Sequence, residues 1–326
     1  MSWTAIDIPD QTGRIVLVTG ANCGLGLETC RALLKRGATV LMGCRSRSRG
    51  ETARSMLMST RQSGAVDLLD LDLSDLESVR RCAALVTEQY GRLDLLVNNA
   101  GIMAPPRTLS RQGYELQFAV NHLGHMALTL AVLPLMEQRL AARVVCVTSG
   151  AQYFGKISWN DIHSERRYRR YEAYSQSKLA NVMFALELNR REQHRGSGIA
   201  CLAAHPGFSR TELQLKAVAS SNAWHESILY RLMDPLFQSA AMGALPQLYA
   251  ATAGTAKGGE HYGPASLGGI RGFPKCWPVA RAAMNVSACK RLWRISEMLL
   301  EGRQEDAVEY SLTASATAPD QQQNEG

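Results

Sequence analysis

The chain has 326 residues, 46% of them hydrophobic, and carries a formal net charge of +7. This composition predicts a globular protein that buries a sizeable core in one large α/β domain or two small ones. Its eight cysteines form no C-x-x-C pair, which argues against a zinc ribbon or a disulfide framework. No apolar stretch reaches membrane-spanning length and the N-terminus has no secretory leader, so the sequence predicts a soluble, cytoplasmic protein.

Short apolar runs alternate with segments of helical periodicity through the first two thirds of the chain. The runs end in Gly, Asn, Asp or Ser and predict parallel strands covered on both faces, at 14–20, 38–45, 66–74, 93–101, 143–150 and 199–207. Helices are predicted at 24–36, 74–90, 114–140 and 173–194. This alternation predicts one Rossmann-type, doubly wound α/β domain over residues 1–302, with helices on both faces of the sheet.

Three further features refine this prediction. Ser74 and Glu77 have the spacing of a capping box at the start of the second helix. After residue 207 the alternation ends, and region 208–256, with a helical stretch at 223–251, is predicted to be a substrate-binding insertion. Its apolar residues predict either a pocket for an apolar substrate or part of a core or subunit interface: Phe208, Trp224, Leu229, Tyr230, Leu232 and Met233. The stretch 254–278 is Gly- and Pro-rich, and 303–326 predicts a flexible C-terminal tail.

The stretch TGANCGLG, residues 19–26, lies between the first predicted strand and the first predicted helix. Gly20, Gly24 and Gly26 would let the backbone approach a pyrophosphate at the helix N-terminus, although a tight turn alone could also explain them. Asp72 ends the third strand, where a carboxylate can meet an adenine amino group. The NNAG motif at 98–101 ends the fourth strand, where small residues admit a ribose.

The helix predicted at 173–194 has one polar and one apolar face. Tyr174 and Lys178 share the polar face with Ser177 and Asn181. An ammonium group one turn away favours the phenolate of a tyrosine, so we expect Lys178 to lower the pKa of Tyr174. Without other motifs, an exposed helical pair would be the favoured explanation of these two residues.

Taken together, the motifs resemble those of the short-chain dehydrogenase/reductase family over about residues 12–272. They are the T-G-x-x-x-G-x-G turn, NNAG, Asn121, VTSG with Ser149, YSQSK at 174–178, and HPGFSRTEL. The resemblance implies a catalytic tetrad of Asn121, Ser149, Tyr174 and Lys178. It also implies a nicotinamide nucleotide held by Gly20, Asn22, Cys23, Gly24, Leu25, Gly26, Arg45, Asp72, Leu73, Asn98, Ala100, Gly101, Tyr174, Lys178, Pro206, Gly207 and Thr211.

The family implies a role for each member of the tetrad. Tyr174 is the general acid/base, Lys178 also binds the nicotinamide ribose, Ser149 orients the substrate oxygen, and Asn121 helps hold a water that relays protons. Family members often form dimers or tetramers through long helices, so the helices carrying Asn121 and Tyr174 are the candidate homo-oligomer interface.

Ser149 and Tyr174 lie 25 residues apart, farther than in compact members of the family. With ANCGLG, GCRS, NHLGH and SKLANV, this spacing resembles the retinol-dehydrogenase-like branch, which implies a hydrophobic carbonyl or alcohol substrate. Related light-dependent protochlorophyllide reductases carry a cysteine after the Pro-Gly pair, whereas this chain has Phe208. That activity therefore ranks below carbonyl reduction. A non-catalytic NADP(H) sensor is a further alternative, which retention of Tyr174 and Lys178 disfavours.

The arginines after the second predicted strand indicate which nucleotide is used. Arg45 follows this strand, and no Asp or Glu lies between Gly43 and Gly50. A guanidinium there can bind the 2′-phosphate of NADP(H), although a solvated basic loop is the alternative. The second basic cluster, at 164–172, predicts a solvated face, and we expect no nucleic-acid partner. No metal is predicted either, because His122 and His125 lack further ligands at a suitable spacing.

Overall fold

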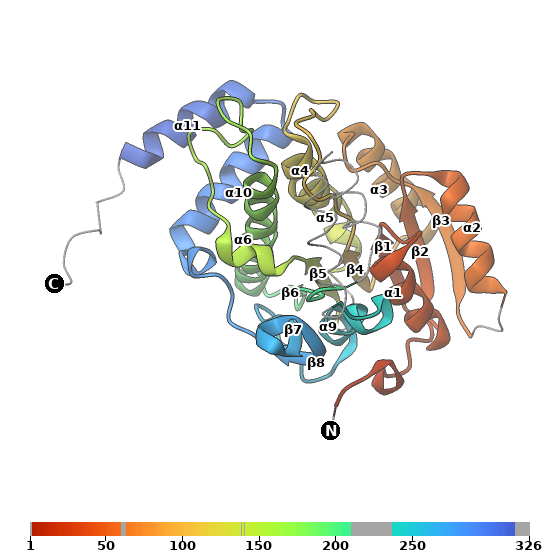
Figure 1. The fold of residues 1–326 in the computed structure, drawn as a ribbon. Coiled ribbons are helices and arrows are strands. Elements are labelled where there is room, and N and C mark those ends of the chain that lie inside the picture. Colours follow the sequence, from red (N-terminus) through yellow and green to blue (C-terminus); the bar gives the residue numbers. More distant parts are fainter. Residues whose placement is uncertain (1, 60–62, 138, 140, 210–236, 317–326) are drawn as a thin grey trace.

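The computed structural model describes residues 2–59, 63–137, 139, 141–209 and 237–316. Within these residues an eight-stranded sheet has the order β3-β2-β1-β4-β5-β6-β7-β8 (Figure 1). Strands β1 to β7 pair in parallel, and β8 is antiparallel to β7. The strands are β1 (Ile15–Thr19), β2 (Thr39–Cys44), β3 (Ala65–Asp70), β4 (Leu95–Asn98), β5 (Arg143–Val147), β6 (Ala200–Ala204), β7 (His261–Ser266) and β8 (Arg271–Cys276).

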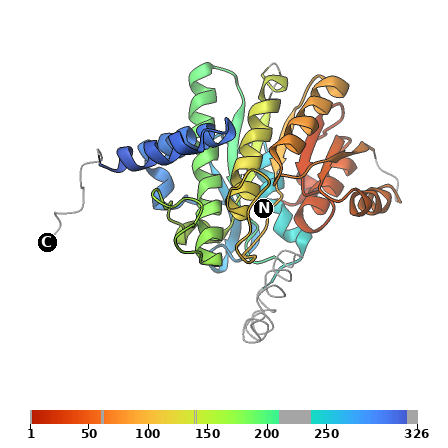
Figure 2. The same ribbon diagram turned by 90° about the horizontal axis from the view of Figure 1, so that it is seen from above.

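Both faces of the sheet are covered, which explains why the strands are continuously apolar. In β1, Ile15 and Leu17 pack into the core on one face, while Val16 and Val18 pack into the core on the other. The first face is covered by α3 (Leu76–Tyr90), α4 (Leu116–Phe118), α5 (Gly124–Val132), α6 (Arg170–Arg195) and α10 (Val286–Leu300). The second is covered by α1 (Gly24–Lys35), α2 (Arg47–Met58) and α9 (Ala240–Thr252). The doubly wound fold is thus confirmed, and Figure 2 shows α3, α5 and α6 side by side.

Three local features differ from or add to the sequence prediction. Asp75, not Ser74, caps α3 by accepting a hydrogen bond from the Glu77 N–H. Helix α2 was not predicted; the Ser46 hydroxyl caps this arginine-rich segment. The Gly- and Pro-rich stretch 254–278 contains the β7–β8 hairpin, which was not predicted either and in which Pro264 and Pro274 lie opposite each other. Prolines lower the strand signal of a sequence but are tolerated in such an edge hairpin.

The helix predicted at 114–140 is a composite helical segment that ends near Leu135. It begins with α4, continues through a π-helical turn, η2 (Ala119–Leu123), and proceeds through α5 to the short 3-10 helix η3 (Leu133–Leu135). The segment Leu116–Leu135 has the length and composition of a membrane span, but 72% of its most apolar 18-residue window is buried inside the protein. It is therefore placed as a core helix, and its π turn carries Asn121.

The C-terminal region corrects the prediction of a tail beginning at residue 303. Helix α11 (Gln304–Ala316) packs on α10 and lies crosswise to α6 in Figure 2. Among the residues of this helix whose burial is described, 304–311 and 313, only Ala307 and Ser311 are buried, which fits the lack of apolar periodicity in the sequence. Helix α10 in turn covers α6, where Trp293 stacks on Phe184 with ring centroids 5.6 Å apart. The face of α6 that carries Phe184 is thus covered by the same chain. Residues 317–326 lie outside the described residues.

Candidate active site

The glycine turn packs directly on the segment that follows β4. Gly20 has φ +65°, and a Cβ there would lie 2.9 Å from the Cα of Ala100. A Cβ on Gly26 would lie 2.3 Å from the carbonyl oxygen of Gly20. Both positions thus require glycine, and Gly24 has a positive φ as well.

The turn leaves the N-terminus of α1 without a side-chain cap. Cys23 occupies the N-cap position, and its side chain makes no capping hydrogen bond. Asn22, Cys23, Gly24 and Leu25 are partly exposed there. The backbone N–H groups and the positive end of a helix favour phosphate, so this cradle fits the pyrophosphate of a dinucleotide.

Thr19 and Asn99 hold the glycine turn against the end of β4. The Thr19 hydroxyl accepts hydrogen bonds from the backbone N–H groups of Asn99 and Ala100, both at 2.9 Å. The Asn99 amide donates to the Thr19 carbonyl at 2.8 Å, and Gln247 of α9 donates to Asn99 Oδ1 at 3.2 Å. Sequence reasoning missed Asn99 and Gln247; for Asn99 the NNAG motif was the available signal, whereas Gln247 had none.

Asn98, which was predicted to bind the cofactor, has its side chain in the core instead. Its amide donates to Thr129 Oγ1 at 2.9 Å and contacts Cys146 Sγ at 3.8 Å, and the residue is 1% exposed. Successive side chains of a strand point to opposite faces, and Asn98 falls on the α5 side. Its side chain therefore packs rather than binds. Gly101 lies close to the predicted catalytic groups: a Cβ there would lie 3.2 Å from Asn121 Oδ1 and 3.3 Å from Lys178 Nζ.

Arg45 lies directly after β2, as predicted, and is exposed. Among the described residues it forms neither an ion pair nor a hydrogen bond. Its neighbour Arg47, by contrast, pairs with Asp70 at 3.1 Å and with Glu51 at 3.6 Å. Arg45 is therefore the guanidinium at this strand end that is available to a ligand anion.

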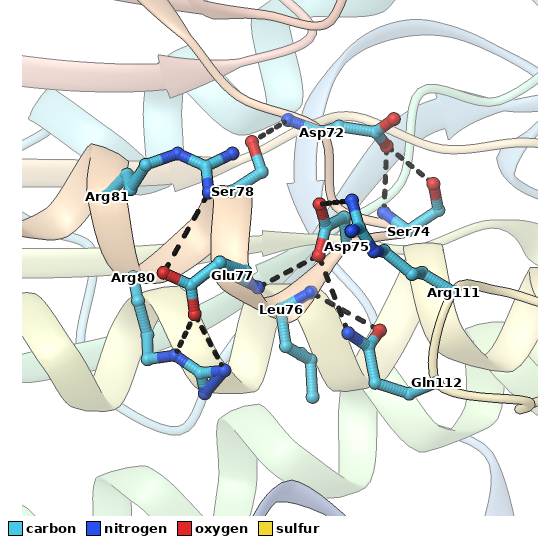
Figure 3. A network of polar contacts seen from close by, with 10 residues as sticks. All are labelled: Asp72, Ser74, Asp75, Leu76, Glu77, Ser78, Arg80, Arg81, Arg111 and Gln112. Atoms are coloured by element: carbon cyan, nitrogen blue, oxygen red, sulfur yellow. Dashed lines mark hydrogen bonds and ion pairs between the residues drawn. The ribbon is translucent and has the colours of Figure 1, made fainter.

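Asp72 is oriented by the turn that leads into α3 (Figure 3). Its Oδ1 accepts hydrogen bonds from the Ser74 N–H at 2.9 Å and the Ser74 hydroxyl at 2.7 Å. Its own N–H donates to Ser78 Oγ at 3.0 Å. The second carboxylate oxygen makes no contact among the residues drawn and can accept a hydrogen bond from an amino group. The next residue, Leu73, is buried in the core.

A loop distant in the sequence supports this turn. Arg111 pairs with Asp75 at 3.2 Å, and Gln112 Oε1 accepts from the Leu76 N–H at 3.3 Å (Figure 3). The Arg111 N–H also donates to the Ser74 carbonyl at 3.1 Å. Nothing in the sequence predicted these contacts, because they join residues more than thirty positions apart.

The catalytic helix α6 is joined to the end of β5 by three hydrogen bonds. Lys178 Nζ donates to the Val147 carbonyl at 3.3 Å, and Asn181 donates to the same oxygen at 3.2 Å. The Thr148 hydroxyl donates to the Lys178 carbonyl at 2.8 Å. These bonds bring Tyr174 next to Ser149, with which it forms a hydrogen bond. The structure thus brings the predicted Ser-Tyr-Lys group together.

The pKa values of Tyr174 and Lys178 are shifted mainly by burial. Burial raises the pKa of Tyr174 to about 12, and the hydrogen bond with Ser149 opposes this shift. Burial lowers the pKa of Lys178 to about 8, with Nζ 5.8 Å from the Tyr174 ring centroid. The expected lowering of the Tyr174 pKa is therefore wrong for this structure: burial dominates, and the opposing shift comes from Ser149 rather than from Lys178. At neutral pH the phenol keeps its proton and can donate it.

Asn121 joins the π turn to the loop after β4 and to α6. Its side chain accepts from the Ile102 N–H at 2.9 Å and donates to the Ile102 carbonyl at 3.0 Å. It also donates to Ser177 Oγ at 2.9 Å. Its carbonyl accepts from His125 Nδ1 at 3.0 Å, and His125 Nε2 lies 2.8 Å from the Thr19 hydroxyl. π turns often occur at functional sites, and this one connects the catalytic helix to the glycine turn.

The two histidines of this helical segment have different partners. His122 Nε2 lies 2.8 Å from Ser296 Oγ of α10, on the side away from His125 and Thr19. Burial lowers the pKa of both rings, to about 3 for His122 and about 4 for His125, so both are neutral. Within the part of the chain that the structure describes, no three His, Cys, Asp or Glu side chains converge as metal ligands.

The Pro206–Gly207 turn is held at the end of β6. Gly207 has φ +63°, and a Cβ there would lie 2.2 Å from the Ile270 carbonyl oxygen. Ser209 Oγ and Gln238 Nε2 both donate to the Pro206 carbonyl at 2.8 Å. The remaining predicted residues of this region lie outside the described residues: Thr211, Trp224, Leu229, Tyr230, Leu232 and Met233.

Comparisons with known proteins agree with this geometry. Residues 14–222 match the family described as short chain dehydrogenase. Retinol dehydrogenase 12 from Homo sapiens is 39% identical over 300 residues, which cover 91% of this chain and 88% of that protein. Retinol dehydrogenase 14 from Homo sapiens is 36% identical over 308 residues, covering 88% and 86%.

Solved structures share the fold. An uncharacterized protein from Mycobacterium paratuberculosis superposes with a TM-score of 0.76 at 39% identity, covering 92% of this chain and 98% of that one. L-sorbose reductase from Gluconobacter frateurii, solved with NADPH and L-sorbose, gives a TM-score of 0.63 at 19% identity, covering 77% and 95%. The second similarity is one of fold alone.

Proposed function

The chain belongs to the short-chain dehydrogenase family, in its retinol-dehydrogenase-like branch, and we propose that it is an NADP(H)-dependent oxidoreductase acting on an apolar carbonyl or alcohol. The observation that carries the proposal is the buried, protonated phenol of Tyr174, hydrogen-bonded to Ser149 and one helical turn from Lys178. A sensor that only binds the nucleotide has no need of a proton donor in this position.

In the proposed mechanism the nicotinamide nucleotide, when bound, supplies or accepts the hydride. Ser149 orients the carbonyl oxygen of the substrate, and Tyr174 donates its proton to that oxygen. The transfer is favourable because an alkoxide is a stronger base than a phenolate. Lys178 then stabilises the phenolate by its charge. Asn121, fixed by Ile102 and Ser177, lies on the route by which the proton is replaced.

The preference for NADP(H) over NAD(H) rests on Arg45. A guanidinium without a protein partner can form paired, charge-assisted hydrogen bonds with a 2′-phosphate. Arg47 supports this preference indirectly, because its ion pair with Asp70 neutralises an acidic side chain at the end of β3.

An apolar substrate is supported by the named activity of the relatives and by the aromatic residues beside the Pro-Gly turn. The relatives are retinol dehydrogenases, and the rings of Phe208 and Phe237 lie 5.9 Å apart next to Pro206–Gly207. Phe208 also stands where related protochlorophyllide reductases carry a cysteine, so that activity is the lesser alternative.

The test is NADPH oxidation by the purified protein with all-trans-retinal, nonanal and a set of ketones. We expect turnover with the apolar aldehydes and none from the Tyr174→Phe variant. Nucleotide binding without turnover across the whole set would replace the proposal with a sensor. Light-dependent reduction of protochlorophyllide, with no carbonyl reduction in the dark, would replace it with the reductase alternative.

A further inference from the structure

The segment between Ser149 and Tyr174, long for this family, is held on two sides by buried glutamines. On one side Gln176 of α6 accepts from the Ser158 N–H at 2.7 Å and donates to the Ile162 carbonyl at 2.9 Å. On the other side lies Gln117 of α4, with no exposed surface. The two glutamines bind different parts of the segment, so their roles can be separated.

Gln117 connects three pieces of chain through one side chain. Its Oε1 accepts from the Ala104 N–H at 2.8 Å. Its Nε2 donates to Tyr168 Oη and to the Arg170 carbonyl, both at 2.9 Å. Both amide protons are therefore used, and removing the side chain would break all three connections at once.

The Arg170 carbonyl matters because α6 begins at this residue, one helical turn before Tyr174. The N-cap residue Arg169 makes no side-chain capping hydrogen bond, so the first turn of α6 lacks the usual stabilisation. The bond from Gln117 to the Arg170 carbonyl does not cap the N–H groups of this turn, but it ties the turn to a neighbouring element. Holding the first turn also fixes the ring of Tyr174 relative to Ser149.

The other partners of Gln117 hold the loop that follows Gly101. Ala104 is buried with φ +49°, an unfavourable conformation for a residue other than glycine. Its N–H binds Gln117, and its carbonyl accepts from Arg170 Nη1 at 3.3 Å. Tyr168 Oη donates to the Pro105 carbonyl at 2.9 Å. The loop and the first turn of α6 are thus held together around Gln117.

We propose that Gln117, together with Tyr168, is a positioning residue for Tyr174. This inference rests on the proposed role of Tyr174 as the proton donor. It assigns the long segment a function: Tyr168 brings a hydroxyl to Gln117 and so completes the support of the catalytic helix. Gln117 itself touches neither the substrate nor the nucleotide.

The test compares Gln117→Met with Gln176→Met, using NADPH and nonanal. Both variants replace a buried glutamine by an apolar side chain of similar size, and both free the same segment. We expect Gln117→Met to lower kcat about tenfold while the Kd for NADPH stays within about twofold, because only the chemical step depends on the tyrosine geometry. We expect Gln176→Met to keep kcat within about twofold.

A kinetic isotope effect separates positioning from a loss of folded protein. With NADPH deuterated at the transferred position, the isotope effect on kcat should rise in Gln117→Met, because the chemical step becomes slower than product release. Partial unfolding would reduce the rate without changing the isotope effect. If Gln117→Met does not fold, Tyr168→Phe, which removes one hydroxyl, should show the same two changes at about a threefold loss of kcat.

The inference would be overturned if Gln117→Met had the same kcat and the same isotope effect as the parent. If only Tyr168→Phe folds, the same result in that variant would overturn it. An equal loss of kcat in Gln176→Met would overturn it too, since the whole segment would then be responsible. Tyr174→Phe is measured alongside. If it retains turnover, the proposed function fails; if it is inactive while Gln117→Met equals the parent, only the positioning role fails.

Discussion

The catalytic end and the adenosine end of the site differ in how their side chains are held. Asn121, Tyr174 and Lys178 are 0%, 6% and 3% exposed and have protein partners. Arg45 is exposed and lacks a protein partner among the described residues, and Arg47 and Asp70 form an ion pair with side chains 62% and 60% exposed. The catalytic groups are therefore oriented by folding, whereas Arg45, at the proposed adenosine end, is free to be oriented by a ligand.

Only at the catalytic end does burying a charged group lower the stability of the fold. Burying Lys178 lowers its pKa to about 8, and lowering the pKa of a lysine by one unit costs the folded, charged form about 1.4 kcal/mol. An exposed arginine keeps its hydration and costs the fold little. We therefore expect substitutions at the catalytic end to change turnover and stability, and substitutions at the adenosine end to change nucleotide affinity alone.

The largest effect is expected from Tyr174→Phe. The ring still fills its site, but the proton donor is gone, so kcat should fall roughly 10³-fold. The Kd for NADPH, measured by fluorescence titration, should stay within about twofold. A kcat within about tenfold of the parent would show that the buried phenol is not the general acid. The contrast between a catalytic end and an adenosine end of the site would then no longer hold.

Lys178→Met should combine a loss of function with a gain of stability. We expect kcat to fall about 10²-fold and NADPH binding to weaken, because Lys178 is proposed both to stabilise the phenolate and to bind the nicotinamide ribose. The folded pKa of Lys178 lies near 8, below the unfolded value of 10.5, so the parent binds fewer protons when folded than when unfolded between these values. The parent should therefore gain stability as pH rises from about 8 to 10.5.

Urea unfolding checks this sign. At pH 7 the variant should be more stable than the parent by on the order of 1 kcal/mol, since it lacks the buried charge but also the bond to Val147. At about pH 10.5, the unfolded pKa, the parent should be the more stable protein, because burying the charge no longer destabilises it while the variant still lacks the bond to Val147. If the variant and the parent differ in unfolding free energy by the same amount at both pH values, burial of the Lys178 ammonium does not destabilise the parent.

Arg45→Ala should change affinity without changing stability. The Kd for NADP(H) should rise about thirtyfold and that for NAD(H) by less than about twofold, because only NADP(H) carries the phosphate. Arg47→Ala is the matched control: Arg47 is paired with Asp70, and its loss should change the ratio of the two affinities far less. Equal effects of both substitutions would point to general charge rather than to Arg45.

The smallest effect is expected from Asp72→Ala. Asp72 is assigned to the adenine, which both nucleotides share, so NADP(H) and NAD(H) should weaken by the same factor, about three- to tenfold. Isothermal titration with each nucleotide measures this factor. A change in the ratio of the two affinities would place Asp72 near the ribose instead of the adenine.

Most of the correct predictions rest on residues that lie close together in the sequence. The glycine turn and the Tyr174–Lys178 pair follow from local rules, and the strands follow from buried apolar runs, so their positions are confirmed within a few residues. Helix α11 and the β7–β8 hairpin were missed because their signals are weak locally: one buries few residues, and the other contains prolines. In both cases packing on distant elements determines the structure.

The sequence by itself determined the order of the first six strands, the family and the identity of the groups that can react. Only the tertiary structure decided that Asn98 turns into the core, that burial raises the pKa of Tyr174, and that Gln117 reaches the first turn of α6. The physical reason is that burial and hydrogen-bond geometry depend on residues far apart in the chain. A local pattern specifies which side chain is present, whereas its solvation and its partners are set by the elements that pack around it.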